Sequence, residues 1–418
     1  AEGVRGSLSK EVIAKYDLSK GHCPQKFGIG MKEIWEIDPA KHREGTVTHT
    51  MGWPLGSNAG GGSFIYHLEG NQVYVGFVVH LNYANPHLYP YMEFQRFKHH
   101  PMVAELLKGG KRVAYGARAI SEGGWQSMPK MVAPGVALLG CSVGMVNVPR
   151  IKGNHNAMLS GKAAAESAYA AIKAGRQGDE LTDYEAEVRN GPIGRDLKKV
   201  RNVKPLWSKY GLVASLMGGG IDMWANTIGL TIFGTLKHGK SDAAATGLAK
   251  NFKPIDYPKP DGKLSFDRLT NVAFSFTNHD EAQPAHLVLK DPSIPISVNL
   301  PKYAEPAQRY CPAGVYEVVA EEGKDPRFVI VDVRSPEEYA AGHIPTAINI
   351  PGGATADIKD PPAKDKYIVV YCHGGRKSPA AAEKMLADGY RHVFVWGGIL
   401  SWPYARETTS KPPLTPSR

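Results

Sequence analysis

Hydrophobic positions divide the first half of the chain into a strand-rich part and a helix-rich part. Residues 1–125 hold short runs rich in Val, Tyr and Phe, and GNQVYVGFVVHLNY (70–83) predicts one long strand or a strand pair. Residues 135–172 predict a strand, a glycine-rich loop and a long Ala-rich helix that begins near Asn154. Prolines spaced along 241–300 predict loops.

A different pattern begins near Gly323 and continues to Trp402. FVIVDV (328–333) is a short apolar run of the kind found in buried parallel strands. SPEEYAAGHIPTAINIP then predicts a short helix and a second strand. A third strand should end at Cys372, followed by a tight loop and a helix from about Ser378. The sequence therefore predicts a small α/β domain at the end of the chain.

The composition of the chain says more about its binding partners than about its fold. The 418 residues, 42% apolar and 22% charged, fit two or three globular domains. The formal charge of +10 favours an anionic partner. The sequence has no paired Cys/His zinc spacing and no aromatic-basic RNA motif, so we expect a lipid or protein partner rather than nucleic acid.

The four cysteines are far apart and form no CxxC pair, which argues against a disulfide framework or a zinc site and favours a reducing compartment. The chain begins without Met and without a signal-peptide pattern, so we expect a processed or truncated start.

Cys372 is the strongest candidate nucleophile. In CHGGRKS the cysteine lies between a strand end and a helix N-terminus, where backbone N–H groups and the helix dipole favour negative charge. Arg376 and Lys377 add positive charge, and together these features should lower the thiol pKa and favour the thiolate. The alternative is a buried, inert cysteine at a strand end.

DVRSPEEY, AGHIPTAINIP, the cysteine loop and VWGGILSW together resemble the rhodanese family over roughly residues 320–405. The resemblance implies that Cys372 accepts a sulfane sulfur as a persulfide and passes it to a nucleophile, with a small donor such as thiosulfate. Arg376 and Lys377 would belong to that catalytic loop. Lys377 stands where many members have Arg, and Thr346 replaces a common Gly after HIP.

The glycine-rich segment GVALLGCSVGMVNVPRIKGNHNAMLSGKAAAE (135–166) resembles the second flavin-contacting motif of glutathione-reductase-like flavoproteins. Small residues in the loop would let the backbone approach a flavin, and the positive helix end would stabilise negative charge on it. Many such enzymes have Asp after the first Gly, where this chain has Cys141. The alternative is a strand, loop and helix that simply pack through small residues.

Several longer motifs resemble electron transfer flavoprotein–ubiquinone oxidoreductase over roughly residues 1–320. They include FGIGMKEIW, HTMGWPL, GGSFIYHL, EFQRFKHHP, GCSVGMVNVPRIKG and CPAGVYE. The resemblance implies FAD and a four-iron cluster, electrons taken from electron transfer flavoprotein, and ubiquinone reduced at a membrane surface. Gly61 and Gly62 match the glycine pair that approaches the quinone, although an ordinary tight turn would also explain them. The residues that the family implies for FAD are Gly140, Cys141, Gly144, Asn147, Gly153 and Asn154.

Two family features are missing from the sequence. GIGMKE (28–33) is not the G-x-G-x-x-G that binds the FAD pyrophosphate, so we expect that segment to lie upstream of residue 1. The cysteine of CPAGVYE, Cys311, is followed in the family by a C-x-x-C-x-x-C group, but here the next cysteine is Cys372. One thiolate cannot hold a four-iron cluster, so we predict none, with Cys311 a leftover ligand or a buried thiol.

Residues 211–236 are long enough to span a bilayer and carry Asp222 as their only charge. Gly218–Gly220 and Asp222 interrupt the apolar run, which favours a segment lying in the membrane interface. Basic residues on both flanks, including Lys209, Lys237 and Lys240, would meet anionic headgroups. The alternative is a buried core helix.

The expected fold class combines α/β and α+β parts: a partial glutathione-reductase-like flavoprotein domain with a quinone and membrane region, then a rhodanese-like domain with a parallel sheet. The expected divisions are a partial FAD/quinone-binding domain (1–175), a basic helical and membrane-interface region (176–240), a remnant of the ferredoxin-like cluster region (241–320), the rhodanese-like domain (321–408) and a disordered tail (409–418).

Three functional hypotheses follow from the sequence. The first is a membrane-associated flavoprotein that passes electrons from electron transfer flavoprotein to ubiquinone and carries an appended sulfurtransferase. The second is a sulfurtransferase on a redox-inactive flavoprotein remnant. The third is a fragment or artificial junction without activity as a whole. The first places the chain on the cytoplasmic side of a bacterial inner membrane or the matrix side of the mitochondrial inner membrane.

Overall fold

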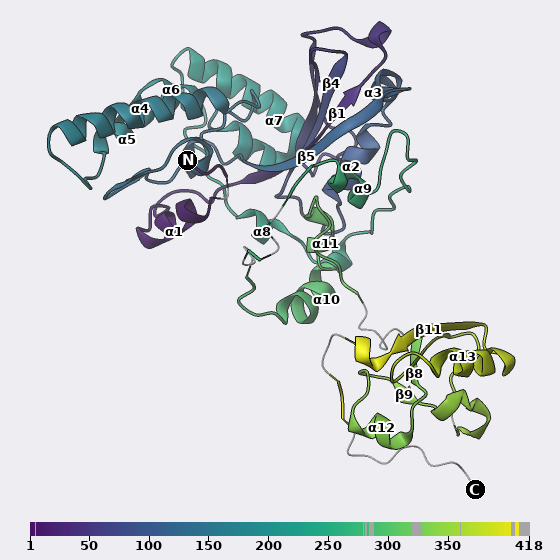
Figure 1. The fold of residues 1–418 in the computed structure, drawn as a ribbon. Coiled ribbons are helices and arrows are strands. Elements are labelled where there is room, and N and C mark those ends of the chain that lie inside the picture. Colours follow the sequence, from purple (N-terminus) through teal and green to yellow (C-terminus); the bar gives the residue numbers. More distant parts are fainter. Residues whose placement is uncertain are drawn as a thin grey trace. The chain divides into compact units, whose positions relative to one another are not determined.

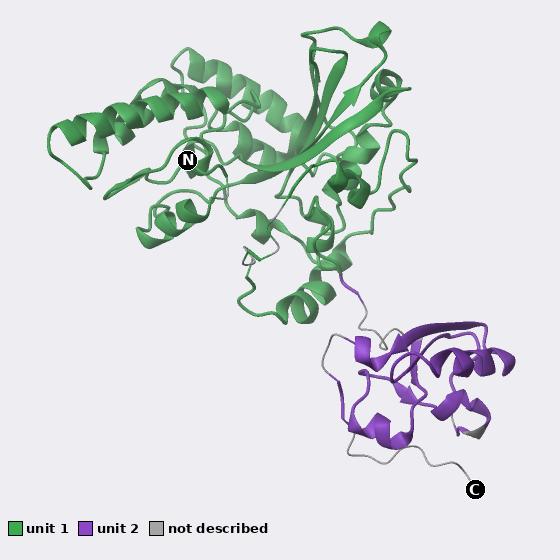
Figure 2. Cartoon of the chain, viewed as in Figure 1, with its two compact units in different colours: residues 1–317 green, residues 318–418 purple. Residues whose placement is uncertain are grey.

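The computed structural model describes residues 1–4, 6–278, 280, 282–283, 288–319, 328–359, 361–402 and 406–408. The chain divides into two compact units, residues 1–317 and residues 318–418, which Figure 2 colours separately. The boundary lies a few residues before Gly323, near which the sequence changes from one pattern to the other. The expected tail, 409–418, lies outside the described residues.

A five-stranded antiparallel sheet organises unit 1 (Figure 1). Its spatial order is β2-β3-β4-β1-β5. The strands are β1 (Phe27–Glu36), β2 (Val47–Met51), β3 (Gly61–His67), β4 (Gln72–His80) and β5 (Lys111–Ser121). The stretch 70–83 is therefore one strand, β4, which is the first of the two alternatives that its composition predicted.

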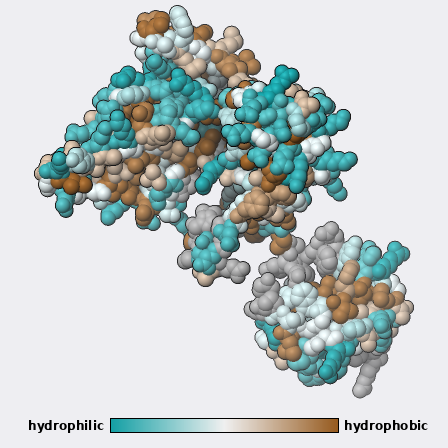
Figure 3. Space-filling model, turned by 45° about the horizontal axis from the view of Figure 1, so that its top comes forward, coloured by the Kyte–Doolittle hydropathy of each residue, from teal (hydrophilic) through white to brown (hydrophobic). Residues whose placement is uncertain are grey.

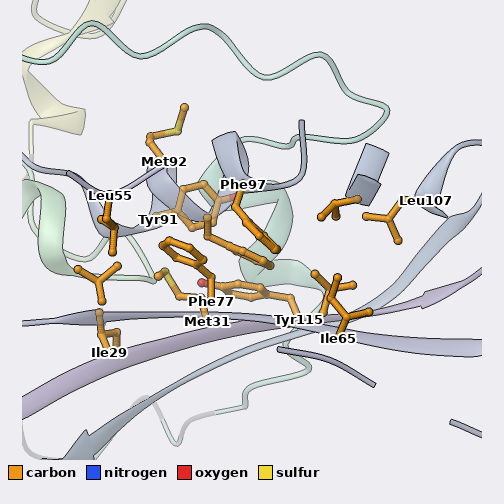
Figure 4. Packing of buried hydrophobic residues seen from close by; sticks show 14 of the residues in the cluster. Ile29, Met31, Leu55, Ile65, Phe77, Tyr91, Met92, Phe97, Leu107 and Tyr115 are labelled. Carbon is orange, nitrogen blue, oxygen red and sulfur yellow. The ribbon is translucent and has the colours of Figure 1, made fainter. Parts of the chain in front are cut away.

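One face of this sheet forms the larger hydrophobic core. Alternate side chains of β4, among them Val75, Phe77 and Val79, are fully buried, as the two-residue period of a strand requires. They pack against helices α2 (Pro90–Phe97) and α3 (Pro101–Leu107). Phe77 stacks on Phe97 with ring centroids 5.3 Å apart (Figure 4). This packing fixes the sheet and therefore the loops at its ends.

A fully buried ion pair crosses this core. Lys98 Nζ donates to Glu33 Oε2 at 2.8 Å, and neither side chain is exposed to solvent. Glu33 also accepts hydrogen bonds from Trp35 Nε1 and Asn271 Nδ2, both at 2.8 Å. The aromatic ring of Phe266 lies 5.1 Å from the ammonium group. The carboxylate therefore satisfies three donors, and two of them, Lys98 and Asn271, come from distant parts of the chain.

Replacing Glu33 by Gln is expected to destabilise unit 1 by about 3–5 kcal/mol, because the substitution leaves the Lys98 charge buried without its partner. Urea unfolding followed by tryptophan fluorescence measures the change. Glu105→Gln is the matched control, because Glu105 pairs with Lys41 at the surface and its side chain is 68% exposed. That variant should unfold at nearly the same urea concentration as the wild type, because an exposed ion pair contributes little to stability. Equal losses in the two variants would contradict the expectation.

A second core in unit 1 lies beside the helices. Its fully buried residues include Met128, Met131 and Tyr184, whose hydroxyl donates to Leu138 O at 2.8 Å. The consecutive helices of this part are α4 (Asn154–Lys173), α5 (Thr182–Asn190), α6 (Pro192–Lys199) and α7 (Val203–Thr227), and α4 begins where the sequence predicted it. The short elements of unit 1 are α1 (Ser7–Lys15), β6 (Val132–Ala133), β7 (Val136–Ala137), α8 (Asp242–Ala245), α9 (Arg268–Ala273), α10 (Leu300–Tyr303) and α11 (Ala307–Tyr310).

Helix α7 bends back on itself at Gly211, whose φ of 78° is not helical. Ser215 Oγ then donates to Val203 O at 3.3 Å, and a side-chain carbon added at Gly219 would lie 3.4 Å from Val203. Gly218–Gly220 therefore do not interrupt the helix, because they lie within it and permit close packing of its second half on its first. Across the described part of the chain, no helix combines the length and apolarity needed to cross a bilayer.

Asp222 is fully buried in this contact, where Asn202 Nδ2 donates to both carboxylate oxygens at 3.1 and 3.2 Å. Asn226 Nδ2 donates to the same carboxylate at 2.8 Å. The only charge of the apolar segment is thus part of its internal packing. Beyond Thr227 the segment is not helical.

Unit 2 is built on a parallel sheet of order β11-β10-β8-β9. The strands are β8 (Phe328–Asp332), β9 (Ile348–Asn349), β10 (Tyr367–Cys372) and β11 (His392–Gly398), with helices α12 (Pro336–Ala341) and α13 (Ser378–Ala387). The predicted small α/β domain is confirmed, including the strand that ends at Cys372. Thr346 has φ 67°, in the left-handed region that glycine, the common residue there in the rhodanese family, adopts without strain.

Candidate functional sites

The loop after β10 surrounds the sulfur of Cys372 with backbone donors. Gly375 N lies 3.1 Å and Lys377 N 3.4 Å from Sγ. The hydroxyl oxygen of Ser378, the first residue of α13, lies 3.6 Å from the same sulfur. Cys372 itself is 2% exposed, so the sulfur lies at the bottom of a loop of N–H groups at a helix N-terminus.

This environment lowers the pKa of the Cys372 thiol below its ordinary value. Burial alone raises the pKa, but the hydrogen bonds from Ser378 and from the N–H groups of Lys377 and Gly375 outweigh it. The thiolate is the nucleophilic form of cysteine, so the loop favours the reactive state.

The side chains of Arg376 and Lys377 are exposed, whereas the backbone of Lys377 reaches the sulfur. The loop therefore acts on Cys372 through its N–H groups at close range. The two cationic side chains are available at the surface to attract an anionic donor.

Replacing Ser378 by Ala should raise the pKa of Cys372, because it removes a donor to the thiolate. Sulfur transfer needs the thiolate, so the acidic limb of its pH–rate profile should move to higher pH while the alkaline plateau changes little. Ser401→Ala is the control, because its hydroxyl bonds to Gly398 O at 2.7 Å and not to the sulfur. An unmoved acidic limb in Ser378→Ala would show that the hydroxyl does not stabilise the thiolate.

The segment that we call the glycine loop, residues 60–62, consists of the residue before β3 and the first two residues of β3, beside β4. Gly61 and Gly62 pair with Val79 and Val78, and a side chain on either glycine would collide with a backbone carbonyl of a neighbouring strand. The two predicted quinone residues are thus strand residues in close backbone packing rather than a tight turn. The space beside Gly61 is filled by Val78 O and Leu55 Cδ1, and the space beside Gly62 by Thr50 O, so glycine is needed for the strands to pack this closely.

The predicted flavin residues lie together in one loop before α4. Gly140 and Gly144 adopt φ values of 56° and 83°, which favour glycine. Gly153 caps α4 and Asn154 begins it. Asn147 is fully buried and donates to Asp196 Oδ2 at 3.0 Å.

One further observation indicates that this loop can hold a flavin. Asn156 Oδ1, in the first turn of α4, is buried and has no hydrogen-bond partner among the described residues. A buried acceptor without a donor is costly, and a flavin carries N–H groups. Cys141 is half-buried and burial raises the pKa of its thiol, which makes it a neutral packing residue there.

Cys311 does not form a cluster site with the residues around it. Its thiol is 9% exposed, and Val315 N lies 3.5 Å from Sγ. Throughout the described ranges, no three His, Cys, Asp or Glu side chains come together as metal ligands. The residues present do not fit a four-iron cluster, and no electron step is assigned to one.

Sequence reasoning missed a set of ionisable side chains buried together between the sheet, α7 and α8. We call it the buried polar cluster: Lys26, His80, Glu122, Lys204, His238 and Asp242. Its members are up to 216 positions apart in the sequence (26 to 242), so no local pattern reveals them. The one available signal is a polar residue closing an apolar strand, as His80 closes β4.

Three family models match the chain. The model described as "ETF-QO, ubiquinone-binding" matches residues 27–120. The model described as "Electron transfer flavoprotein-ubiquinone oxidoreductase, 4Fe-4S" matches residues 262–334, and the model described as "Rhodanese-like domain" matches residues 316–404. The first spans nearly the whole five-stranded sheet and the glycine loop. The third spans the parallel sheet and Cys372.

Similar curated proteins agree with the first two matches. Electron transfer flavoprotein-ubiquinone oxidoreductase of Pseudomonas aeruginosa is 49% identical over 385 residues, covering 91% of this chain and 66% of that protein. The mitochondrial electron transfer flavoprotein-ubiquinone oxidoreductase of Caenorhabditis elegans is 45% identical over 392 residues, covering 90% of this chain and 62% of that protein. The chain thus spans less than two thirds of the length of these relatives. A solved rhodanese with anions from E. coli is 33% identical, covering 20% of this chain and 99% of that one, with a TM-score of 0.18.

Proposed function

The chain is a homologue of electron transfer flavoprotein-ubiquinone oxidoreductase with a rhodanese-like region, and from this premise we propose that unit 1 passes electrons from reduced electron transfer flavoprotein to ubiquinone. The observation that carries the proposal is the ubiquinone-binding match, which covers residues 27–120 and includes Gly61 and Gly62.

FAD would be held by the loop before α4, through Gly140, Cys141, Gly144, Asn147, Gly153 and Asn154. When bound, FAD supplies two-electron chemistry between the electron donor and the quinone. The chain's own residues orient it: α4 presents its N-terminus, and Asn156 offers an unpaired acceptor. The expected glutathione-reductase-like architecture and the segment boundaries at 175, 240 and 320 remain part of this proposal.

A membrane surface would bring the quinone to unit 1. The outer face of α7 exposes Val213, Met217 and Trp224, each about two thirds accessible. Exposed apolar residues continue to Phe233, and Lys237 and Lys240 follow. Figure 3 shows that apolar patches interrupt the hydrophilic surface of the molecule. An apolar stripe beside lysines suits an anionic bilayer, on the inner face of a bacterial or mitochondrial inner membrane.

Unit 2 would act as a sulfurtransferase, and the N–H loop around Cys372 favours this second activity. The Cys372 thiolate attacks the outer sulfur of thiosulfate, the S–S bond of the donor breaks, and sulfite leaves with the bonding electrons. A cysteine persulfide remains, and a nucleophile such as cyanide then takes the outer sulfur and regenerates the thiolate. This activity needs no cofactor and can persist if unit 1 is redox-inactive.

The visible spectrum of the purified chain, taken after FAD is added and the excess removed, tests the oxidoreductase proposal. A retained flavin band that dithionite bleaches supports it. A chain that retains no flavin refutes flavin-based electron transfer by this chain and leaves sulfur transfer as its activity. A broad iron–sulfur absorbance would contradict the interpretation of Cys311.

A further inference from the structure

We propose that the buried polar cluster delivers protons to a quinone bound at the glycine loop, with His80 as the last residue of the path. The inference rests on the proposed quinone-reducing function and adds the residues that would complete its proton chemistry. Reduction of a quinone consumes two protons as well as two electrons, so a quinone bound inside a protein needs a proton source.

His80 joins the cluster to the glycine loop. Its backbone N donates to Gly60 O at 2.9 Å, and its Nδ1 occupies the space that a side chain on Gly60 would need. Gly61 and Gly62 follow directly. One ring nitrogen of His80 therefore faces the loop that the quinone would approach.

Glu122 connects His80 to a buried lysine. Its Oε2 lies 3.4 Å from His80 Nε2 and accepts a hydrogen bond from Lys204 Nζ at 2.5 Å. All three side chains are at most 7% exposed. Lys204, Glu122 and His80 thus form a series of close polar contacts that ends beside Gly60.

The least buried end of the cluster is the ion pair of Lys26 and Asp242. Lys26 Nζ lies 3.2 Å from Asp242 Oδ1, and the side chain of Asp242, at 11%, is the most exposed member of the ion pairs. His238 Nε2 lies 2.8 Å from Gly123 O, next to Glu122. A proton lost to the quinone can be replaced from this side.

The cluster also borders the flavin loop. Gly123 N, beside Glu122, donates to Gln25 Oε1 at 2.7 Å, and a side chain on Gly144 would collide with Gln25. The cluster thus lies between the two sites that the proposed electron transfer would use. The ring of Trp207 meets that of His80 edge-on at 4.8 Å, and its Nε1 is buried without a partner among the described residues.

The shifted pKa values of His80 and Lys204 are compatible with a relay of protons through the cluster. Burial, assisted by Lys204, holds the pKa of His80 well below its usual range, so the imidazole is neutral and can take a proton at one nitrogen while releasing one at the other. Burial also lowers the pKa of Lys204; Lys26 acts in the same direction, and Glu122 and Asp242 oppose it. A lysine with a lowered pKa gives up its proton more readily.

The proton step balances within the cluster once electrons are supplied by a reduced flavin or flavoprotein. As the quinone takes two electrons, the Nδ1–H bond of His80 breaks and one quinone oxygen gains a proton. The proton shared by Lys204 and Glu122 moves to Nε2, and Lys204 regains one from solvent through the Asp242 side. The second quinone oxygen takes its proton from solvent, giving the quinol.

His80→Gln tests the relay without changing the charge of the cluster. The full chain is loaded with FAD, reduced, and mixed with decylubiquinone; binding of decylubiquinone is measured separately by quenching of tryptophan fluorescence. We expect binding within about threefold of the wild type, a rate of quinone reduction lower by about 100-fold, and a larger solvent isotope effect. His99→Gln, which loses only a contact of 3.0 Å with Ser265 Oγ, should behave as the wild type.

A charge-neutral pair change gives a second test if His80→Gln fails to fold. Glu122→Gln with Lys204→Met removes both charges of the path and should likewise slow reduction while retaining quinone binding. In Glu122→Gln alone, the pKa of Lys204 falls further because its opposing carboxylate is lost, so the alkaline decline of the rate should begin at lower pH.

The outcomes separate the two proposals. A wild-type chain that does not bind decylubiquinone overturns the quinone-reducing function and the relay with it. A wild type that binds and reduces the quinone, with variants that match its rate and isotope effect, overturns the relay alone and leaves the cluster a structural element. Unchanged binding with a slowed, isotope-sensitive rate supports the relay.

Discussion

Replacing Cys372 by Ala is expected to abolish sulfur transfer from thiosulfate to cyanide, with a loss of at least about 10³-fold in the rate of thiocyanate formation. The substitution removes the atom that forms the persulfide, and neighbouring donors cannot replace a nucleophile. Gly375 N and Lys377 N would still form their loop, since the helix that follows is held by its own packing.

Two controls accompany this variant. Cys23→Ala and Cys141→Ala remove half-buried thiols of unit 1 and should leave sulfur transfer unchanged. Mass spectrometry after thiosulfate treatment should find one added sulfur on the wild type and none on Cys372→Ala. Thiocyanate formation that persists in Cys372→Ala would remove this cysteine from the reaction.

Placing glutamate at Val213, Met217 and Trp224 together is expected to weaken binding to anionic lipid vesicles by at least about 100-fold. Each apolar side chain partitioning into the interface contributes on the order of 1 kcal/mol, and each glutamate adds repulsion from the anionic headgroups. The three positions lie on one face of α7, opposite the buried residues Ser215, Gly219 and Asp222, so the fold should tolerate the change.

The matched control places glutamate at Met158, Tyr169 and Ile172 of α4, which are also exposed apolar positions. It carries the same added charge on another surface and should bind nearly as the wild type does. Vesicle flotation at low and high salt measures both variants. If the triple variant of α4 loses as much vesicle binding as the triple variant of α7, the net charge of the chain alone explains its binding to vesicles. Helix α7 is then not the face that meets the membrane.

Sequence patterns predicted the secondary-structure elements that depend on short-range interactions. The apolar run of β4, the start of α4 at Asn154 and the strand–loop–helix around Cys372 all depend on neighbours within a few residues. The rhodanese-like and quinone-binding matches agree with the motifs that suggested them. Composition predicted two or three domains, and the chain divides into two compact units.

Long-range packing could not be predicted in this way. Gly218–Gly220 resemble a break in an apolar segment, yet they are helical because Val203, many residues earlier, packs against Gly219. Asp222 is buried because Asn202 folds back onto it. The sequence predicted positive charge near the sulfur from Arg376 and Lys377, but it could not predict that the backbone N–H of Lys377 reaches Sγ while both side chains are exposed.

The measurement that tests the central claim most directly is anaerobic oxidation of the reduced, FAD-loaded chain by decylubiquinone, followed by flavin absorbance. If unit 1 is a quinone-reducing flavoprotein, the flavin band returns on adding the quinone, and an equivalent amount of quinol forms. A chain that binds no FAD, or whose bleached flavin stays reduced in the presence of decylubiquinone, would contradict that account.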